Sequence, residues 1–194
     1  MSFVNYVARQ IDRKIVYFGP SLSGKTTNLR WIHEHIPAGR DGRMISVPGE
    51  RSSPLFFDFL SVGLGSYLGF NVRLHLYSVP GQTEGRASRM RMLRGADGIV
   101  LVADSDRQRL ADNLEALKEL QESLHQQGRD LLSVPYLLQL NKRDLATALP
   151  LDSLKSVLVL NGEPVIEAVA SQGAGVYETL HEVGRLVLAQ VKPS

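Results

Sequence analysis

Short apolar segments alternate along the chain with stretches whose apolar residues recur at every third or fourth position. Residues 98–104 and 134–140 are near-continuous apolar runs, a pattern typical of central parallel strands that are covered on both faces. Residues 14–19 and 164–170 are shorter apolar runs that predict two further strands. Strands that alternate with helices in this way indicate an α/β sheet with helices on both sides.

Three stretches have the spacing of helices with one apolar face. Pro37 ends the first and Gly128 ends the second, while the third follows the last strand. Their apolar positions are Leu29, Ile32 and Ile36; Leu110, Leu114, Leu117, Leu120 and Leu124; and Val176, Leu180, Val183 and Val187. Residues 55–60 and 70–77 interrupt the alternation as a strand pair around the turn-rich SVGLGSYLG. We therefore expect an α/β fold with a mixed, mostly parallel sheet, one antiparallel strand and helices on both faces.

The composition fits one domain over residues 1–194. The chain is 43% hydrophobic, which suffices for a core, and its net charge of +2 demands neither nucleic acid nor a membrane surface as a partner. It contains no cysteine, which excludes disulfides, a cysteine nucleophile and thioester or prenyl anchors. No apolar run approaches the roughly 20 residues of a membrane span. We expect a cytoplasmic protein without an integral membrane segment or a lipid anchor.

A glycine-rich segment, GPSLSGKT at residues 19–26, lies between a predicted strand and the start of a predicted helix. It fits the pattern G-x-x-x-x-G-K-[ST], in which glycines let successive backbone N–H groups face the phosphates of a nucleotide. The positive end of the helix adds to this attraction. We expect Lys25 to reach the β- and γ-phosphates and the Thr26 hydroxyl to ligate Mg²⁺. The predicted phosphate-binding residues are Gly19, Pro20, Ser21, Leu22, Ser23, Gly24, Lys25, Thr26 and Thr27.

The segment NKRD at residues 141–144 follows the apolar run 134–140 and matches the N-K-x-D element of guanine-nucleotide proteins. A carboxylate accepts hydrogen bonds from both N1–H and the N2 amine of guanine, and adenine offers no such pair, so Asp144 predicts GTP and GDP as ligands. We expect Asn141 to brace the loop and the stem of Lys142 to lie along the base. Ala170 and Ser171 stand where such proteins place a backbone N–H that meets the guanine O6.

These elements make the chain resemble the Ras-like P-loop small GTPases over nearly its whole length, and most of all the bacterial gliding-motility and cell-polarity GTPases known as MglA. The resemblance rests on KIVYFGPSLSGKTTNL, LFFDFL, LHLYSVPGQ, the A-S-R at 87–89, LRGADGIVLVADS, QLNKRDL and EAVASQGAGV. That family replaces the usual switch aspartate with a small hydroxyl residue, here Ser78. The resemblance implies that the Gly81 N–H senses the γ-phosphate and that Gln82 orients the attacking water. It leaves Mg²⁺ on Thr26, phosphate oxygens and waters.

The first switch loop, expected between Pro37 and Leu55, departs from the family. The family carries Arg-Thr before its Leu-Phe-Phe-Asp-Phe strand, the arginine as an intrinsic finger and the threonine as a magnesium ligand, whereas this chain has Ser53-Pro54. Proline has no hydroxyl and no N–H, and an arginine finger is typically worth about 10³–10⁵ in rate. Arg51 is the candidate replacement, so Gln82, Lys25 and Arg51 form the predicted catalytic set. A solvated loop charge is the alternative for Arg51.

Four arginines mark the second switch helix, at Arg86, Arg89, Arg91 and Arg94, and they predict either a solvated face or a partner site. The resemblance implies a roadblock-fold, MglB-like homodimer as activator, downstream motility and polarity effectors, and recruitment to a cell pole. The five histidines are expected to be ordinary surface or edge residues: His33, His35, His75, His125 and His181.

Two functions stay open at this stage. One is a GTP/GDP switch with slow hydrolysis that a partner accelerates, favoured by Gln82 and the complete phosphate loop. The other is a guanine-nucleotide-dependent scaffold that has lost hydrolysis, favoured by Ser53-Pro54. An ATP-using kinase is disfavoured by NKRD and by the lack of a phosphate-acceptor lid.

Overall fold

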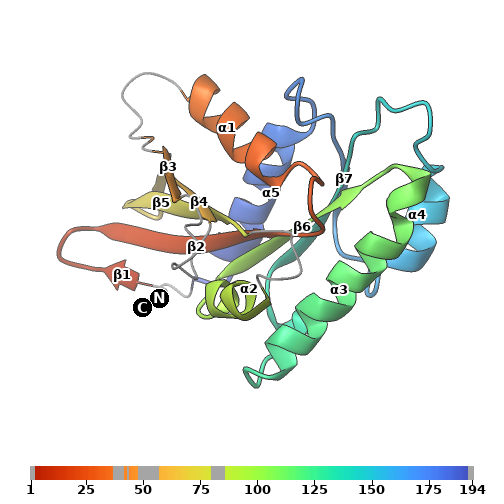
Figure 1. Ribbon diagram of the computed structural model, residues 1–194. Coiled ribbons are helices and arrows are strands. Elements are labelled where there is room, and N and C mark those ends of the chain that lie inside the picture. Colours follow the sequence, from red (N-terminus) through yellow and green to blue (C-terminus); the bar gives the residue numbers. More distant parts are fainter. Residues whose placement is uncertain (1–2, 37–41, 43, 48–56, 80–85, 192–194) are drawn as a thin grey trace.

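A computed structural model describes residues 3–36, 42, 44–47, 57–79 and 86–191. Strands and helices alternate along most of the chain (Figure 1). In chain order the strands and α-helices are β1 (Phe3–Asn5), β2 (Gln10–Phe18), α1 (Lys25–His35), β3 (Met44–Val47), β4 (Phe57–Tyr67), β5 (Phe70–Ser78), α2 (Arg86–Leu93), β6 (Gly98–Asp104), α3 (Leu110–His125), β7 (Tyr136–Asn141), α4 (Leu151–Leu158), β8 (Val165–Glu167) and α5 (Val176–Leu188). Short 3-10 turns precede α3 at Arg107–Arg109 and β7 at Leu131–Ser133.

One eight-stranded sheet runs through the centre of the molecule, with seven strands in the order β3-β4-β5-β2-β6-β7-β8. The pairs β2/β5, β2/β6, β6/β7 and β7/β8 are parallel. Among the described strands of this path β4 is the one that runs the other way, as the sequence predicted, and β1 pairs antiparallel with β2 outside the path. The fold is therefore the predicted α/β sheet, mixed and mostly parallel.

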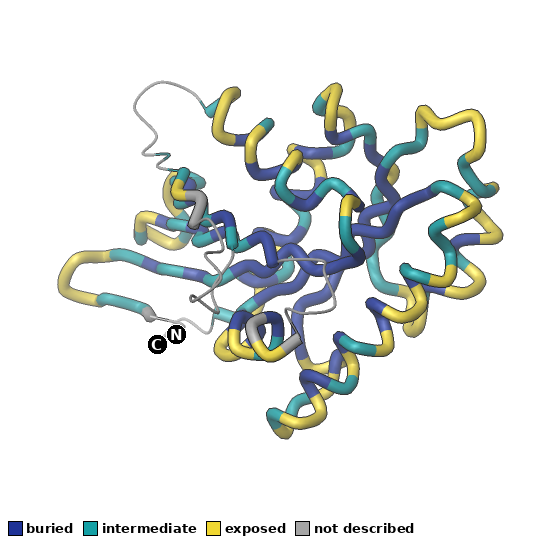
Figure 2. The backbone as a smooth tube through the Cα atoms, in the orientation of Figure 1, coloured by how far each residue is buried: buried dark blue, intermediate teal, exposed yellow. Residues whose placement is uncertain are grey.

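Helices cover both faces of the sheet, because its central strands are apolar on both sides. One core layer packs side chains of α2, α3 and α4 against residues such as Val16 and Phe18 of β2. The other packs α1 and α5 against the opposite side of the same strand, with Ile15 and Tyr17. Figure 2 shows the buried strands as a continuous dark band between the helices. The close packing of both layers holds the strand ends in fixed positions.

Several elements differ from the expectations. The glycine-rich SVGLGSYLG is mostly strand, because β4 continues to Tyr67 and only Leu68 and Gly69, both with positive φ, form the turn to β5. A β-bulge between Gly63 and Gly65 accommodates the extra residue. The strand predicted at 14–19 begins at Gln10, and a short β1 that the apolar pattern did not predict completes a hairpin with it.

The prediction of a loop from Pro37 to Leu55 was also wrong in part, because this segment contains a strand. Residues Met44–Val47 form β3, which pairs antiparallel with β4 at the edge of the sheet. The helix α4 was missed as well, because its eight residues are too few to establish a helical period. Apart from Gly42, the remaining residues of the expected switch loop, among them Arg51, Ser53 and Pro54, lie outside the described residues.

Candidate functional site

The phosphate loop joins the end of β2 to the start of α1, at the edge where parallel strands end. Its backbone takes left-handed conformations at Gly19, Leu22 and Gly24, with φ of 141°, 62° and 102°. A Cβ at Gly19 would lie 2.3 Å from the Val102 carbonyl oxygen, and one at Gly24 would lie 2.0 Å from Nδ2 of Asn141. Only glycine fits at these two positions, so the segment curls as a phosphate-binding loop must.

Lys25, the lysine of the motif, is buried in the loop, with 5% of its surface exposed. Its ammonium group donates to the carbonyl oxygens of Gly19, at 3.0 Å, and Pro20, at 2.5 Å. Burial, and then the charges of Arg89 and Arg109, lower the pKa of Lys25 to about 7. The ammonium thus lies inside the curl of the loop, where an anion would stabilise its charged form.

Three oxygen-bearing side chains meet at the first turn of α1. The Thr26 hydroxyl donates to Oδ2 of Asp58 at 2.6 Å and lies 3.2 Å from the Ser78 hydroxyl. Asp58 on β4 and Ser78 on β5 are direct cross-strand partners, and both are buried. A carboxylate beside two hydroxyls is the ligand chemistry that Mg²⁺ prefers. Our sequence analysis missed Asp58, although a lone carboxylate at an inward position of the apolar strand LFFDFL was a usable signal.

The side chain of Asn141 ties the phosphate loop to the segment that contains Ala170. Its Nδ2 donates to the Ser23 carbonyl at 2.7 Å, and its Oδ1 accepts from the Ala170 N–H at 2.9 Å. Asn141 and Ala170 are buried, whereas Ser171 is exposed. The Ala170 N–H therefore already has one acceptor, and contact with a guanine O6 would require it to share its hydrogen.

Charged groups line the rim between the phosphate loop and residues 141–144. The Lys142 ammonium, on a backbone with φ of 65°, donates to Oδ2 of buried Asp104 at 2.7 Å. Asp144 is exposed. Arg109, which sequence reasoning did not single out, donates to the Ser21 carbonyl at 2.7 Å and pairs with Asp112. A guanidinium thus holds the tip of the phosphate loop from the start of α3.

The fold therefore brings most of the predicted nucleotide residues to one edge of the sheet. They are the phosphate loop, Thr26 and residues 141–144. Thr27 is also on this edge but is exposed. Gly81, Gln82 and Arg51 lie outside the described residues, so their roles remain predictions. Among the described residues there is no group of three or more His, Asp or Glu side chains that could hold a metal. A magnesium site here would combine the one carboxylate of Asp58 with hydroxyls and with ligands from the nucleotide.

Comparison with known proteins decides the family. Residues 66–185 match the ADP-ribosylation factor family. The mutual gliding-motility protein MglA of Myxococcus xanthus (strain DK1622) is 47% identical over 192 residues, which cover 99% of this chain and 98% of that protein. The chain belongs to the MglA-type small GTPases. A small GTPase of this family binds guanine nucleotide and hydrolyses GTP. The curled loop and the rim described above are the predicted nucleotide site.

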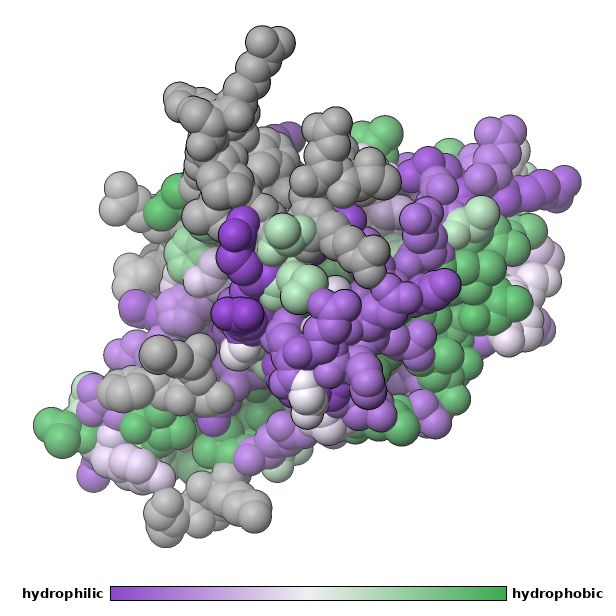
Figure 3. Space-filling model, turned by 60° about the horizontal axis from the view of Figure 1, so that its bottom comes forward, coloured by the Kyte–Doolittle hydropathy of each residue, from purple (hydrophilic) through white to green (hydrophobic). Residues whose placement is uncertain are grey.

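The position of Arg89 on the arginine-rich helix of this small GTPase differs from one of the two expectations, a solvated face. Arg89 of α2 is not on a solvated face: it is 5% exposed and donates two hydrogen bonds to Glu119 of α3. Arg91 and Arg94 are exposed, and the side chain of Arg86 lies outside the description. Figure 3 turns the lower side of Figure 1, where α2 and the far end of α3 lie, toward the reader, and its centre is broadly hydrophilic. A partner that reads α2 would therefore meet Arg91 and Arg94 rather than Arg89.

The histidines are surface or edge residues, as expected. His33, His35, His125 and His181 are exposed, and His75 is half-buried, with its Nε2 2.9 Å from Asp12. No described helix of this small GTPase is long and apolar enough to cross a membrane.

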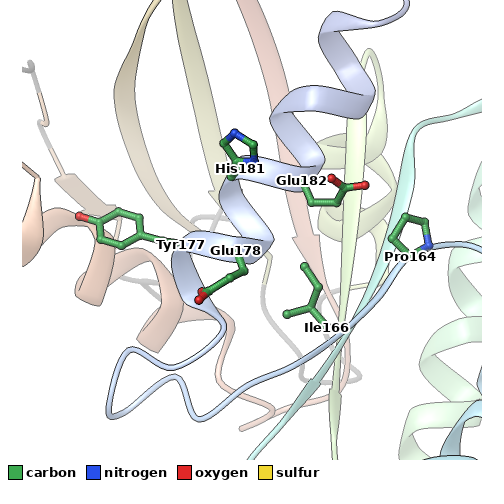
Figure 4. A pocket seen from close by; sticks show the side chains of 6 residues that line it. All are labelled: Pro164, Ile166, Tyr177, Glu178, His181 and Glu182. Carbon is green, nitrogen blue, oxygen red and sulfur yellow. The ribbon is translucent and has the colours of Figure 1, made fainter.

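A groove of about 590 Å³ opens between β8 and α5 (Figure 4). It is lined by Pro164, Ile166, Tyr177, Glu178, His181 and Glu182. None of these residues belongs to the predicted nucleotide set.

Proposed function

We propose that this protein is a GTP/GDP switch with slow, magnesium-dependent GTP hydrolysis that regulates bacterial cell polarity and gliding or pilus-driven motility. The name of the Myxococcus xanthus relative, a mutual gliding-motility protein, supports the pathway. Its partners would be a roadblock-fold, MglB-like activating dimer and downstream motility effectors. It would work in the cytoplasm and be recruited to a cell pole.

The observation that carries the proposal is the contact between Thr26 and Asp58. Small GTPases usually place an aspartate where this chain has Ser78, and the loss of that carboxylate argues against a working magnesium site. Asp58 lies directly across the strand pair from Ser78, with its carboxylate 2.6 Å from the Thr26 hydroxyl. The Asp58 carboxylate would therefore take over the role of the missing aspartate from the neighbouring strand.

The residues around the phosphate loop would act by binding and orienting the nucleotide. Lys25 would exchange its two carbonyl acceptors for phosphate oxygens, Thr26 would offer its hydroxyl, and Asp58 would orient that hydroxyl or a water beside it. When bound, Mg²⁺ would neutralise phosphate charge and fix the geometry of the terminal phosphate. Gln82 would orient the attacking water, and Gly81 would sense the γ-phosphate. Positioning and charge neutralisation alone sustain slow hydrolysis in this fold.

Single-turnover GTP hydrolysis across a series of Mg²⁺ concentrations tests this role of Asp58. We expect slow but measurable hydrolysis by the parent protein, and an Asp58→Asn variant that needs at least about 10-fold more Mg²⁺ for half-maximal rate. Asp152→Asn, an exposed carboxylate in the first turn of α4, is the matched control. An unchanged magnesium requirement in Asp58→Asn would contradict the role.

A guanine-nucleotide-dependent scaffold without hydrolysis is the second candidate function. Ser53-Pro54 favours it, because neither residue replaces the Arg-Thr of the family. The same single-turnover measurement separates the two, since a scaffold would bind GTP and leave it intact over many hours.

A further inference from the structure

Two buried amide side chains face each other in the core, one on α1 and one on β7. Nδ2 of Asn28 donates to Oε1 of Gln139 at 2.9 Å, and Nε2 of Gln139 donates to Oδ1 of Asn28 at 2.9 Å. Both side chains are fully buried. An apolar pair would fill such a position without the cost of removing two amides from water, so the pair calls for a role other than packing.

The amide pair extends at both ends to the backbone of a loop. The second hydrogen of Asn28 Nδ2 reaches the Gly24 carbonyl of the phosphate loop at 3.0 Å. The second hydrogen of Gln139 Nε2 reaches Oγ1 of Thr179 at 2.8 Å, and this hydroxyl donates to the Gly175 carbonyl at 2.6 Å. Thr179 is also fully buried. The result is an unbroken, water-excluded chain of hydrogen bonds from the phosphate loop to the segment Ala170–Gly175.

Gln139 lies two residues before Asn141 on the same strand, so both side chains point to the same face of the sheet. Asn141 joins the same two segments at the end of the strand, through Ser23 and Ala170. β7 therefore carries two parallel cross-links, one at its C-terminal end and one two residues earlier, deeper in the core. Figure 1 shows α1 and α5, the two helices that the deeper link connects, next to each other, and both belong to the same core layer.

We propose that Asn28, Gln139 and Thr179 are positioning residues of the nucleotide site, which hold the phosphate loop and the Ala170–Gly175 segment in a fixed relation and thereby slow nucleotide release. The inference rests on the proposed function, because the second segment is the one expected to meet the guanine base. A nucleotide held at its phosphates by one loop and at its base by the other leaves when one loop moves away. The buried chain opposes that movement without touching the ligand, which is the effect of a preorganised site.

The experiment measures the release of a fluorescent GDP analogue, chased with excess GDP, together with thermal unfolding. Thr179→Val keeps the shape of the side chain but removes the hydroxyl, whereas Thr179→Ser keeps the hydroxyl. We expect release from Thr179→Val to be at least about 5-fold faster and release from Thr179→Ser to stay within about 2-fold of the parent. Equal rates in the two variants would overturn the inference.

A double variant separates positioning from stability. Asn28→Leu and Gln139→Leu each leave the partner amide buried without the two bonds that join the amides, so each should lower the unfolding temperature. The two substitutions together should restore much of it. Release should nevertheless stay at least about 10-fold faster in the double variant. Val183→Ala, a fully buried α5 residue outside the network, is the control that loses stability but keeps the parental release rate. Parental release from the double variant would show that the amides serve the core alone.

Failure of the inference is distinguishable from failure of the proposed function. If the parent protein retains no guanine nucleotide, the proposed function fails. If the parent retains it and all variants release it at the parental rate, only the inference fails.

Discussion

Arg89 of α2 and Glu119 of α3 form a two-bond ion pair, in which Nε and Nη2 of the guanidinium each donate to a carboxylate oxygen at 2.8 Å. The two side chains are 6% and 15% exposed. The pair joins the second switch helix to the body of the protein at a position where the sequence alone suggested either a solvated face or a partner site. Because Arg89 is buried and Glu119 is mostly covered, removing one charge leaves the other without its partner.

The first prediction follows from this pair. Arg89→Ala should lower the free energy of unfolding by about 3 kcal/mol, because it leaves the Glu119 carboxylate desolvated and unpaired. Combining Arg89→Met with Glu119→Leu should recover most of that loss. Urea unfolding of the single and double variants measures both effects, and a double variant no more stable than Arg89→Ala would show that the pair does not act as a unit.

The second prediction concerns the activating partner. We expect a roadblock-fold dimer to bind the GTP form in preference to the GDP form, through exposed Arg91 and Arg94. The affinity of this binding should fall as the salt concentration is raised. Stimulation of hydrolysis should be modest, because the dimer would order groups that the GTPase already has, and this chain lacks the usual arginine. Affinity of Arg91→Ala and Arg94→Ala across a salt series tests the surface, with exposed Arg107→Ala as control. Binding that ignores salt or nucleotide state would contradict it.

The third prediction is a proton uptake on nucleotide binding. The pKa of Lys25 is lowered to about 7 by burial and by the charges of Arg89 and Arg109. The side chain therefore loses its proton more readily than an ordinary lysine, whereas phosphates stabilise its charged form and raise the pKa. Binding to nucleotide-free protein should take up more protons at pH 8 than at pH 6.

Calorimetry in buffers of different ionisation enthalpy measures that uptake. Arg109→Gln should shift its onset to higher pH, because one of the charges that lower the Lys25 pKa is removed. Equal proton uptake at pH 6 and pH 8 would assign it to other groups.

The fourth prediction concerns the base. Lys25→Ala should abolish nucleotide binding, and Asp144→Asn should weaken GTP binding by at least about 10²-fold and widen the choice of base. Competition between GTP, GDP, ATP and xanthine nucleotides for a fluorescent GDP analogue measures the preference. Exposed Asp152→Asn is the control, and equal affinity of the parent for ATP and GTP would sink the assignment.

The fifth prediction concerns the first switch. Introducing Ser53→Arg and Pro54→Thr together should raise intrinsic hydrolysis at least about 10-fold, because an arginine finger and a hydroxyl would be restored. Arg51→Ala should lower the parental rate if that arginine has taken over part of the role. Single-turnover hydrolysis rates test both expectations. A restored variant that is no faster than the parent would contradict the hypothesis that Ser53-Pro54 slows this GTPase.

Local signals determined much of this protein from the sequence. The phosphate loop is a contiguous motif whose glycines satisfy a backbone requirement, so its eight letters predict the curl seen at Gly19 and Gly24. The buried strands β6 and β7 were equally predictable, because a run of apolar residues has one stable place in a sheet covered on both faces. The segment 141–144 could be placed at the strand ends for the same reason.

Only the tertiary structure decided which distant side chains meet. Asp58 and Thr26 are 32 residues apart, and their contact depends on the register of β4 against β5, which one inserted bulge would shift. The sequence around Arg89 does not show whether its side chain faces water or Glu119. The packing of α2 on α3 determines that it contacts Glu119. The link from Asn28 through Gln139 to Thr179 joins residues that are far apart in the sequence, and no hydrophobic period in the sequence predicts it. Hydrophobic patterns determine which face of an element is buried, whereas the polar contacts across that burial are specified by three-dimensional packing.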